Sequence, residues 1–508
     1  MRDRTLWLLL SAACLSLLLV PGVSGFDFSK LENSVKEHTL DNGLKIIVME
    51  RHEAPVASFL TYANVGSVDD PKGYTGIAHM FEHMAFKGTT TLGTKDIDRE
   101  LELMMVEDSI FLLLRAERNK GLLADSVRIN ELEAAFDEAC DAAYELVVPN
   151  AFGETVDREG GHFLNAGTGK DQTVYFFSLP SNKVEFWMAM ESERFLNPIL
   201  REMYRERNVV AEERRMVVES RPFGRLMEEF LALSYKAHPY GISIIGHMSD
   251  IQYYSLDAAK AQFEKYYGPS NLTVAIVGDV KPKEVFKLAE KYWGRIAPRP
   301  APERIATVEP EQSGERRMEM EDPSQPLYLV GWHIPEITHP DRPAIDALLD
   351  YLGQGRTSLL YKNLVKEKKI ATRVGSLPTG YVGDKYPTMA IVYTMPSQGH
   401  DNYECEVEIL AETEKLKEEL IADEEVDKIK ARAKADFIAG GGFMGGLNSN
   451  LGLAIQLAGY QNYWGNWREM FKELDRINAV TPEDIQRVAK QYFTKKNRVV
   501  VMMNTVES

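Results

Sequence analysis

Hydrophobic and polar positions along this chain follow two periodicities, one typical of strands and one typical of helices. β-rich apolar runs bounded by turn residues predict strands at 43–49, 57–62, 173–179, 272–277 and 326–332. Apolar residues spaced three and four apart predict helices from about residue 75 and over 182–196, 202–220 and 255–267. Because strands and helices are mixed in both halves of the chain, we predict an α+β fold of layered sheets and helices.

The sequence that ends the first half is echoed near the C-terminus. Asn271 stands between a predicted helix and a predicted strand, and Asn497, 226 positions later, stands between another such pair. Tyr267 and Phe493 are separated by the same interval. A repeat of this length predicts two homologous domains, since the repeats of a solenoid are only about 20–50 residues long.

The pattern changes between residues 296 and 316. Apolar periodicity is lost there, and four prolines stand among charged residues: Pro298, Pro300, Pro302 and Pro310. This composition is typical of an exposed linker. We therefore expect an N-terminal domain over 26–295, the linker over 296–316 and a C-terminal domain over 317–508.

Residues 99–150 form a second distinct segment, because they are helical in pattern and rich in acidic residues. We interpret them as a helical hairpin that packs on the surface of the first domain as an insertion.

The first 25 residues have the layout of a secretory signal peptide. Arg2 and Arg4 precede an apolar run over 6–20, and small residues precede Phe26. We therefore expect cleavage after residue 25 and a periplasmic or secreted protein. A lipoprotein anchor through Cys14 is the weaker alternative, because little apolar sequence precedes it. The run is too short to span a bilayer comfortably, and no later stretch reaches that length, so no membrane span is expected in the mature chain.

Composition excludes several classes of protein. A chain of 508 residues is too long for one ordinary core. Its 59 basic and 76 acidic residues give a formal net charge of −17, which argues against nucleic acid as a partner. Three cysteines are too few for a disulfide scaffold or a cysteine-based zinc module. The two that would remain after cleavage, Cys140 and Cys405, could pair, and the sequence leaves this open.

The strongest candidate chemistry lies in the pentapeptide His79-Met80-Phe81-Glu82-His83. On a helix, His79 and His83 are four residues apart and project from one face, so both imidazoles can bind one metal ion. Glu82 shares that face and can take a proton from water. The order His-x-x-Glu-His is a known metallopeptidase motif. The alternative is an ordinary buried helix whose histidines and carboxylate find other partners.

A catalytic zinc ion usually has a third protein ligand. Glu206 and Glu213 lie seven residues apart on a predicted helix, two turns along one face, whereas Glu212 is turned away by about 100°. One of the pair can bind the metal while the other orients a ligand histidine. The competing interpretation is a solvated helix face carrying ion pairs with neighbouring arginines.

These motifs together resemble the pitrilysin/insulinase family of zinc peptidases. The resemblance also rests on Asn165-Ala166-Gly167-Thr168, on the run 171–175 and on His238-Pro239-Tyr240-Gly241, and it extends over residues 35–503. It implies two homologous α/β-sandwich domains of the processing-peptidase type and one Zn²⁺ per chain. His79, His83 and Glu213 would be ligands, Glu82 the general base and Glu206 the carboxylate that orients a ligand histidine. Asn165 and Ala166 would hold an extended peptide substrate by strand addition.

Two departures from the family pattern matter. His83 and Glu213 are 130 positions apart, which is longer than usual, and the insertion 99–150 accounts for the excess. In the C-terminal half, Val365 and Thr372 stand where the family often has Arg and Tyr.

The missing pair bears on partners. We expect a zinc endopeptidase acting inside a chamber, as one subunit of a heterodimer whose homologous partner supplies the Arg/Tyr pair. A homodimer in which Tyr381 or Arg373 substitutes ranks second. A catalytically silent assembly or binding subunit is the alternative from another class.

Overall fold

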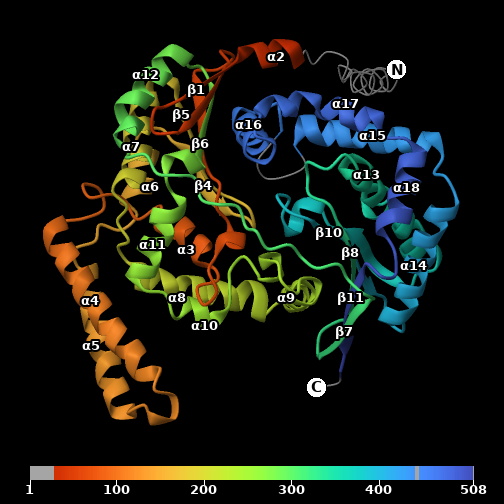
Figure 1. Ribbon diagram of the computed structural model, residues 1–508, viewed down its shortest axis with the longest axis horizontal. Coiled ribbons are helices and arrows are strands. Elements are labelled where there is room, and N and C mark those ends of the chain that lie inside the picture. The colour runs from red at the N-terminus through yellow and green to blue at the C-terminus, as the bar shows by residue number, and fades with distance from the viewer. Residues whose placement is uncertain (1–27, 441–445, 507–508) are drawn as a thin grey trace, which may run out of the picture.

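The computed structural model describes residues 28–440 and 446–506. Within them the chain forms two halves, each built on one twisted sheet with helices packed against it (Figure 1), so the α+β prediction is confirmed. The predicted signal peptide, 1–25, lies outside the described residues. Among the helices of the described ranges, none combines the length and apolar character needed to cross a bilayer.

The first half is built on a sheet whose described strands follow the spatial order β1-β2-β6-β3-β5-β4. Neighbours run antiparallel except β2 and β6, which are parallel. Strand β4 lies at one edge. The strands are β1 Val35–Thr39, β2 Lys45–Glu50, β3 Val56–Ala63, β4 His162–Thr168, β5 Thr173–Pro180 and β6 Leu272–Gly278.

The second half repeats this arrangement, with the described strands in the order β7-β11-β8-β10-β9. The parallel pair is now β7 and β11 and lies at one end of this sheet, whereas in the first sheet β1 lies outside the parallel pair. The other neighbours are antiparallel. The strands are β7 Arg316–Asp322, β8 Leu327–Ile334, β9 Ala371–Ser376, β10 Thr388–Pro396 and β11 Arg498–Thr505. Five strands of the first sheet therefore have counterparts in the second.

The sequence echo has a physical basis in this repeat. Helices α11 (Leu256–Tyr266) and α18 (Pro482–Tyr492) precede β6 and β11 at the same interval. Asn271 donates its side-chain N–H to the Tyr266 carbonyl at 2.8 Å, and Asn497 donates to the Tyr492 carbonyl at the same distance. Each asparagine satisfies a carbonyl at the helix end, which explains why the residue recurs there.

The two halves interlock, because each covers one face of the other's sheet. Helix α16 (Asn450–Trp464) belongs to the second half and packs Leu453 and Leu457 against strands of the first sheet. Helix α9 (Pro222–Ser234) belongs to the first half and packs Leu226 and Phe230 against strands of the second. Figure 1 shows both helices between the sheets. Apolar burial across this contact holds the halves together.

The opposite face of each sheet is covered by helices of its own half. In the first half these include α3 (Ile77–Met84), α6 (Ala151–Arg158), α7 (Val184–Leu196), α8 (Met203–Arg214) and α12 (Pro282–Tyr292). In the second they include α13 (Arg342–Gly353), α14 (Asn402–Glu418) and α15 (Asp423–Ala439). Three further helices are short: α2 (Phe28–Ser34), α10 (Met248–Ile251) and α17 (Glu473–Ala479).

Two segments stand outside this layered core. Residues 297–315 carry neither helix nor strand, and Glu309 accepts the backbone N–H groups of Lys236, Ala237 and His238 at 2.8–3.0 Å. Helices α4 (Ile97–Arg118) and α5 (Ser126–Tyr144) form a hairpin at the edge of the first half (Figure 1).

Candidate metal centre

Helix α3 carries the candidate histidines, and its start is fixed by its surroundings. Asp70 accepts the backbone N–H groups of Gly76 at 2.7 Å and Ala78 at 3.1 Å. Gly76 has φ 87°, and a Cβ there would lie 2.2 Å from the Ile245 carbonyl oxygen, so only glycine fits. One face of the helix is buried through Ile77, Met80, Phe81 and Met84. This anchors the helix and leaves the histidine face toward α8.

The structure brings His79, His83 and Glu213 together. Glu213 Oε2 lies 3.7 Å from His79 Nε2 and 3.4 Å from His83 Nε2. One ligand atom from each of the three residues lies within 4.8 Å of the others. Two imidazole nitrogens and one carboxylate oxygen are the donor set of many catalytic zinc sites. The residues therefore fit a zinc ion.

Helix α8 places Glu206 and Glu213 on the face toward α3, as the seven-residue spacing predicts. Glu206 Oε2 lies 3.2 Å from His83 Nδ1, and its other oxygen accepts from Lys87 Nζ at 2.5 Å. Glu212 points away and pairs with Arg215 on the surface. A carboxylate behind a ligand histidine fixes the imidazole orientation, so Glu206 is placed for that role.

Charges at this centre favour a cation. Burial pulls the pKa of His83 down, but Glu206 and Glu213 outweigh it and raise the pKa to about 9. Burial lowers the pKa of His79. The hydrogen bond with His83 holds the pKa of Glu213 below its usual value. Burial raises the pKa of Glu206, yet the bonds from His83 and Lys87 bring it below normal. Metal binding would replace the proton that His83 otherwise carries.

A cavity of about 660 Å³ opens beside this centre. His79, Glu82 and Glu213 line it, so the candidate base faces the same space as two candidate ligands. Its apolar wall comes from Val217, Val218, Phe223, Met227 and Leu231. Tyr381, from the second half, also lines it. The cavity therefore lies between the two halves of one chain.

The edge strand β4 leads into this cavity. Asn165 and Ala166 pair with Phe176 and Tyr175 of β5 on one side, whereas no described strand pairs with β4 on the other. Gly167, the next residue along β4, lines the cavity. An extended peptide added to this edge would run toward Glu82.

Val365 and Thr372, which stand where the family often has Arg and Tyr, do not line the cavity. Val365 packs against the core of the second half. Thr372 lies on β9, where its hydroxyl donates to the Met395 carbonyl at 3.2 Å. Arg373, one of the two proposed substitutes, stacks its guanidinium 5.8 Å from the Tyr393 ring centre. Of the proposed substitutes, only Tyr381 reaches the cavity.

Sequence reasoning missed Lys87 and Arg214. Lys87 lies beyond the end of α3 at Met84, so helical spacing does not place it, and its contact with Glu206 depends on the loop that follows the helix. Arg214 follows the candidate ligand Glu213, and its guanidinium binds Glu228 at 2.9 Å and the Gly246 carbonyl. No sequence feature indicated that contact, because residues 228 and 246 are distant in the chain.

Cys140 and Cys405 are both free in the structure. Cys140 is half-buried on α5, and Cys405 is buried on α14 in the other half. The open question of their pairing is answered: they form no disulfide with each other.

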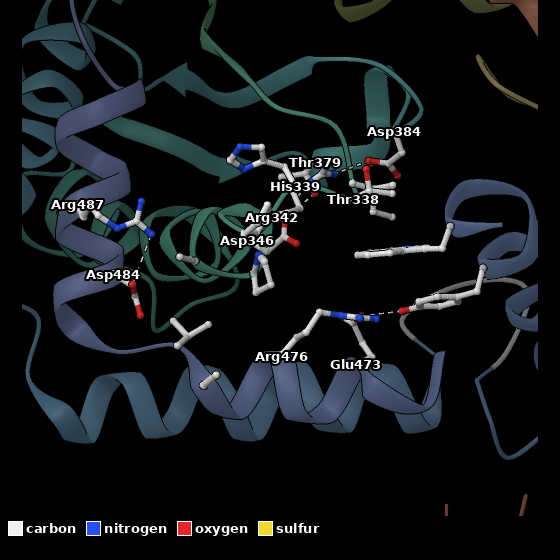
Figure 2. Close-up of a pocket in the computed structure, with 18 residues that line it drawn as sticks. Thr338, His339, Arg342, Asp346, Thr379, Asp384, Glu473, Arg476, Asp484 and Arg487 are labelled. Atoms are coloured by element: carbon white, nitrogen blue, oxygen red, sulfur yellow. Dashed lines mark hydrogen bonds and ion pairs between the residues drawn. The ribbon is translucent and has the colours of Figure 1, made fainter. Parts of the chain in front are cut away.

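A second cavity of about 490 Å³ lies between α13, α16, α17 and α18 (Figure 2). Its arginines are paired with neighbouring carboxylates: Arg342 with Asp384, Arg476 with Glu473, and Arg487 with Asp484. A fourth carboxylate of the lining, Asp346, also pairs with Arg342, so none of the three arginines is left without a carboxylate partner. In the described part of the chain, the one cluster fit for a metal lies in the other cavity.

Comparison with known proteins agrees with this geometry. The profile described as "Insulinase (Peptidase family M16)" matches residues 45–110 and 148–247, and "Peptidase M16 inactive domain" matches 253–433. The chain belongs to peptidase family M16, with an N-terminal and a C-terminal domain of that family. The first profile leaves out 111–147, which are most of the α4–α5 hairpin.

Relatives match nearly the whole chain. The zinc protease PqqE of Helicobacter pylori is 29% identical over 479 residues, covering 92% of this chain and 91% of PqqE. The crystal structure of a protease from Helicobacter pylori superposes with a TM-score of 0.75 at 27% identity, covering 92% of this chain and 99% of that one. Pitrilysin shares the fold with a TM-score of 0.65 at 16% identity, covering 93% of this chain and 45% of pitrilysin.

Proposed function

We propose that this protein is a zinc-dependent endopeptidase that hydrolyses extended peptides or unfolded segments. The observation that carries the proposal is the convergence of His79, His83 and Glu213 beside a cavity that Glu82 also lines. The similarity to PqqE, which is named a zinc protease, supports it. A silent assembly subunit would not need an intact ligand set and base in one cavity.

In this proposal His79, His83 and Glu213 hold one zinc ion per chain. Zinc supplies polarisation of the scissile carbonyl and a lowered pKa for water. Glu82 takes a proton from the attacking water and passes it to the leaving amine. Glu206, itself held by Lys87, keeps the His83 ring oriented. Asn165 and Ala166 on β4 bind the peptide backbone, which selects extended rather than folded substrates.

We propose that this chain alone does not fully stabilise the tetrahedral intermediate and that a homologous partner subunit supplies the missing donors. Removing one preorganised donor typically lowers the rate about 100–1000-fold. Val365 is committed to its own core and the Thr372 hydroxyl to a strand carbonyl, so neither supplies a donor. The partner would carry Arg and Tyr and close the chamber.

Tyr381 favours a second possibility, a homodimer. It lines the zinc-side cavity of its own chain, and burial raises the pKa of its phenol, so it stays a neutral donor at neutral pH. A Tyr381→Phe variant distinguishes the two. If Tyr381 substitutes for the missing donor, the single chain should be active and lose about 100-fold on substitution.

The experiment is a peptide-library assay of the purified mature chain, alone and with its co-purifying homologue. Chelator should abolish cleavage and added zinc should restore it. Activity that appears only with the homologue supports the heterodimer. Full activity of the single chain, sensitive to Tyr381→Phe, supports the homodimer. Cleavage that survives complete removal of zinc would refute the proposed function.

We further propose the cellular setting and domain limits. Export by the signal peptide 1–25 would place the enzyme in the periplasm or outside the cell, and the periplasmic protease PqqL shares the fold. The domain limits proposed are 26–295 and 317–508, with the linker 296–316 between them. N-terminal sequencing of the native protein tests the cleavage, with Phe26 expected first.

A further inference from the structure

Two motifs of the sequence have no part in the site described so far. Asp171 begins the run 171–175, and Tyr240 belongs to His238-Pro239-Tyr240-Gly241. The structure joins them: Tyr240 donates its hydroxyl to Asp171 Oδ1 at 2.5 Å, and Lys170 Nζ donates to the Tyr240 carbonyl at 3.1 Å. Lys170, Asp171 and Tyr240 are all buried. A carboxylate buried in this way needs partners for its charge.

The other oxygen of Asp171 reaches across to the second half. Asp171 Oδ2 accepts the backbone N–H groups of Asp384 at 2.6 Å and of Lys385 at 3.1 Å. Hydrogen bonds to an ionised acceptor are stronger than those between neutral groups. Asp384 and Lys385 belong to a segment over 379–386, which we call the Tyr381 loop. The first half therefore holds the main chain of this loop through Asp171.

The Tyr381 loop also packs closely on Tyr240. Gly383 has φ 113°, and a Cβ there would lie 2.4 Å from Cζ of the Tyr240 ring, so the position requires glycine. The Tyr240 hydroxyl accepts the backbone N–H of Tyr386 at 3.3 Å. The loop is thus stopped by the Tyr240 ring on one side and bound by Asp171, so its main chain has one position.

This loop carries Tyr381 into the zinc-side cavity. Among the described residues that line the cavity, Tyr381 alone comes from the second half. It lies in the short helical turn Thr379–Val382, where its N–H donates to the Pro378 carbonyl at 2.9 Å and the Gly383 N–H donates to the Gly380 carbonyl at 3.1 Å. The Tyr381 side chain is 45% exposed. Its place in the cavity therefore depends on where the loop is held.

The second half holds the same loop by side chains. Figure 2 shows that Thr379 and Asp384 face the second cavity, where the Thr379 hydroxyl donates to Asp346 at 2.6 Å and Asp384 pairs with Arg342. These contacts fix the loop toward its own half. Asp171 fixes it toward the metal centre, which is the side that matters for the zinc-side cavity.

We propose that Asp171 is a positioning residue for peptide hydrolysis: it holds the Tyr381 loop so that the Tyr381 side chain lies against the bound peptide. This rests on the proposed peptidase function, because Tyr381 acts only on a peptide in the zinc-side cavity. Asp171 does not line that cavity and acts through the loop. It lies three residues beyond Thr168, the end of β4, so one turn sets both the edge strand and the loop. Asp171 and Tyr381 share one chain, so the proposal holds for either assembly.

A double-mutant cycle of Asp171→Asn and Tyr381→Ala tests the proposal. It is measured as kcat/KM for one cleaved peptide, with the zinc-loaded assembly that is active. Asparagine has one acceptor oxygen, so it cannot serve both the Tyr240 hydroxyl and the loop N–H groups. Each single variant should lower kcat/KM by at least about tenfold. The double variant should be no worse than Tyr381→Ala, because Asp171 acts through Tyr381.

Hydrogen exchange of residues 379–386 measures the hold on the loop without any substrate. Asp171→Asn should speed exchange of this segment at least about tenfold, with zinc content unchanged. Glu412→Gln is the matched control. The Glu412 carboxylate is also buried and accepts from the Asn363 side chain at 2.6 Å, but it lies on α14, which lines neither cavity. It should leave both loop exchange and kcat/KM as in the wild type.

Gly383→Ala keeps the test decisive if Asp171→Asn folds poorly. The added methyl group pushes the loop off Tyr240 while Asp171 stays intact, so it should also speed loop exchange and lower kcat/KM. Wild-type kcat/KM in Tyr381→Ala, additive losses in the double variant, or unchanged loop exchange in Asp171→Asn would overturn the proposal alone. A zinc-loaded wild type that cleaves no peptide would overturn the proposed function and this proposal with it.

Discussion

Substitution of Arg201 should destabilise the first half strongly. Its guanidinium binds Glu100 at 2.7 Å and 3.2 Å, and both side chains are almost completely buried. It also donates to the carbonyls of Lys87 at 2.6 Å, Leu92 at 2.8 Å and Thr89 at 3.0 Å. Arg201 therefore joins the hairpin to the loop that follows α3.

The magnitude follows from what Arg201→Met leaves behind. Glu100 would become a buried charge without its partner, and breaking a buried pair in this way costs about 3–5 kcal/mol. At about 2–4 °C per kcal/mol for a domain of this size, the melting temperature of the first half should fall by about 6–20 °C. Lys87 would lose the anchor on its carbonyl, so zinc affinity should also fall.

The assay is urea and thermal unfolding followed by circular dichroism, with Arg215→Met as the control. Arg215 pairs with Glu212 on the surface, where the side chains are 48% and 67% exposed, so its loss should cost less than about 1 kcal/mol. Adding Glu100→Gln to Arg201→Met removes the stranded charge and should recover about 1 kcal/mol or more. If Arg201→Met cost no more than Arg215→Met, the reasoning from buried charge would be refuted.

Glu213→Gln should sharply lower zinc occupancy, measured by metal analysis after dialysis, whereas Glu206→Gln should weaken zinc affinity only about 10–100-fold; a larger loss for Glu206→Gln would reverse their roles. Burial lowers the pKa of His238 to about 4, so its neutral form is favoured in the folded state. Stability should be complete above about pH 6.5 and fall toward pH 4, by up to ~3 kcal/mol for this group. His238→Gln should reduce the dependence of the free energy of unfolding on pH over this range. An unchanged dependence would show that His238 is not its cause.

Much of the metal centre could be predicted because its information is local. Helical spacing alone sets His79, Glu82 and His83 on one face of α3. It likewise sets Glu206 and Glu213 on one face of α8. That a catalytic zinc usually has three protein ligands indicated Glu206 or Glu213 as the third, and the choice of Glu213 rested on the family resemblance. The repeat was visible because Asn271 and Asn497 each satisfy a helix-end carbonyl.

The interlocking of the halves was not predictable in this way. An apolar face on α9 or α16 shows that the helix is covered, but periodicity does not say which sheet covers it. The place of Tyr381 in the zinc-side cavity depends on that same long-range packing.

The central claim is that one zinc ion and Glu82 together hydrolyse peptides. The most direct measurement is zinc content and single-turnover cleavage of the same purified samples, wild type and Glu82→Gln. The account predicts about one zinc per chain in both, with cleavage by Glu82→Gln lower by at least about 100-fold, since only proton transfer is removed. A wild type that cleaves without zinc, or Glu82→Gln cleavage within about tenfold of wild type, would contradict it.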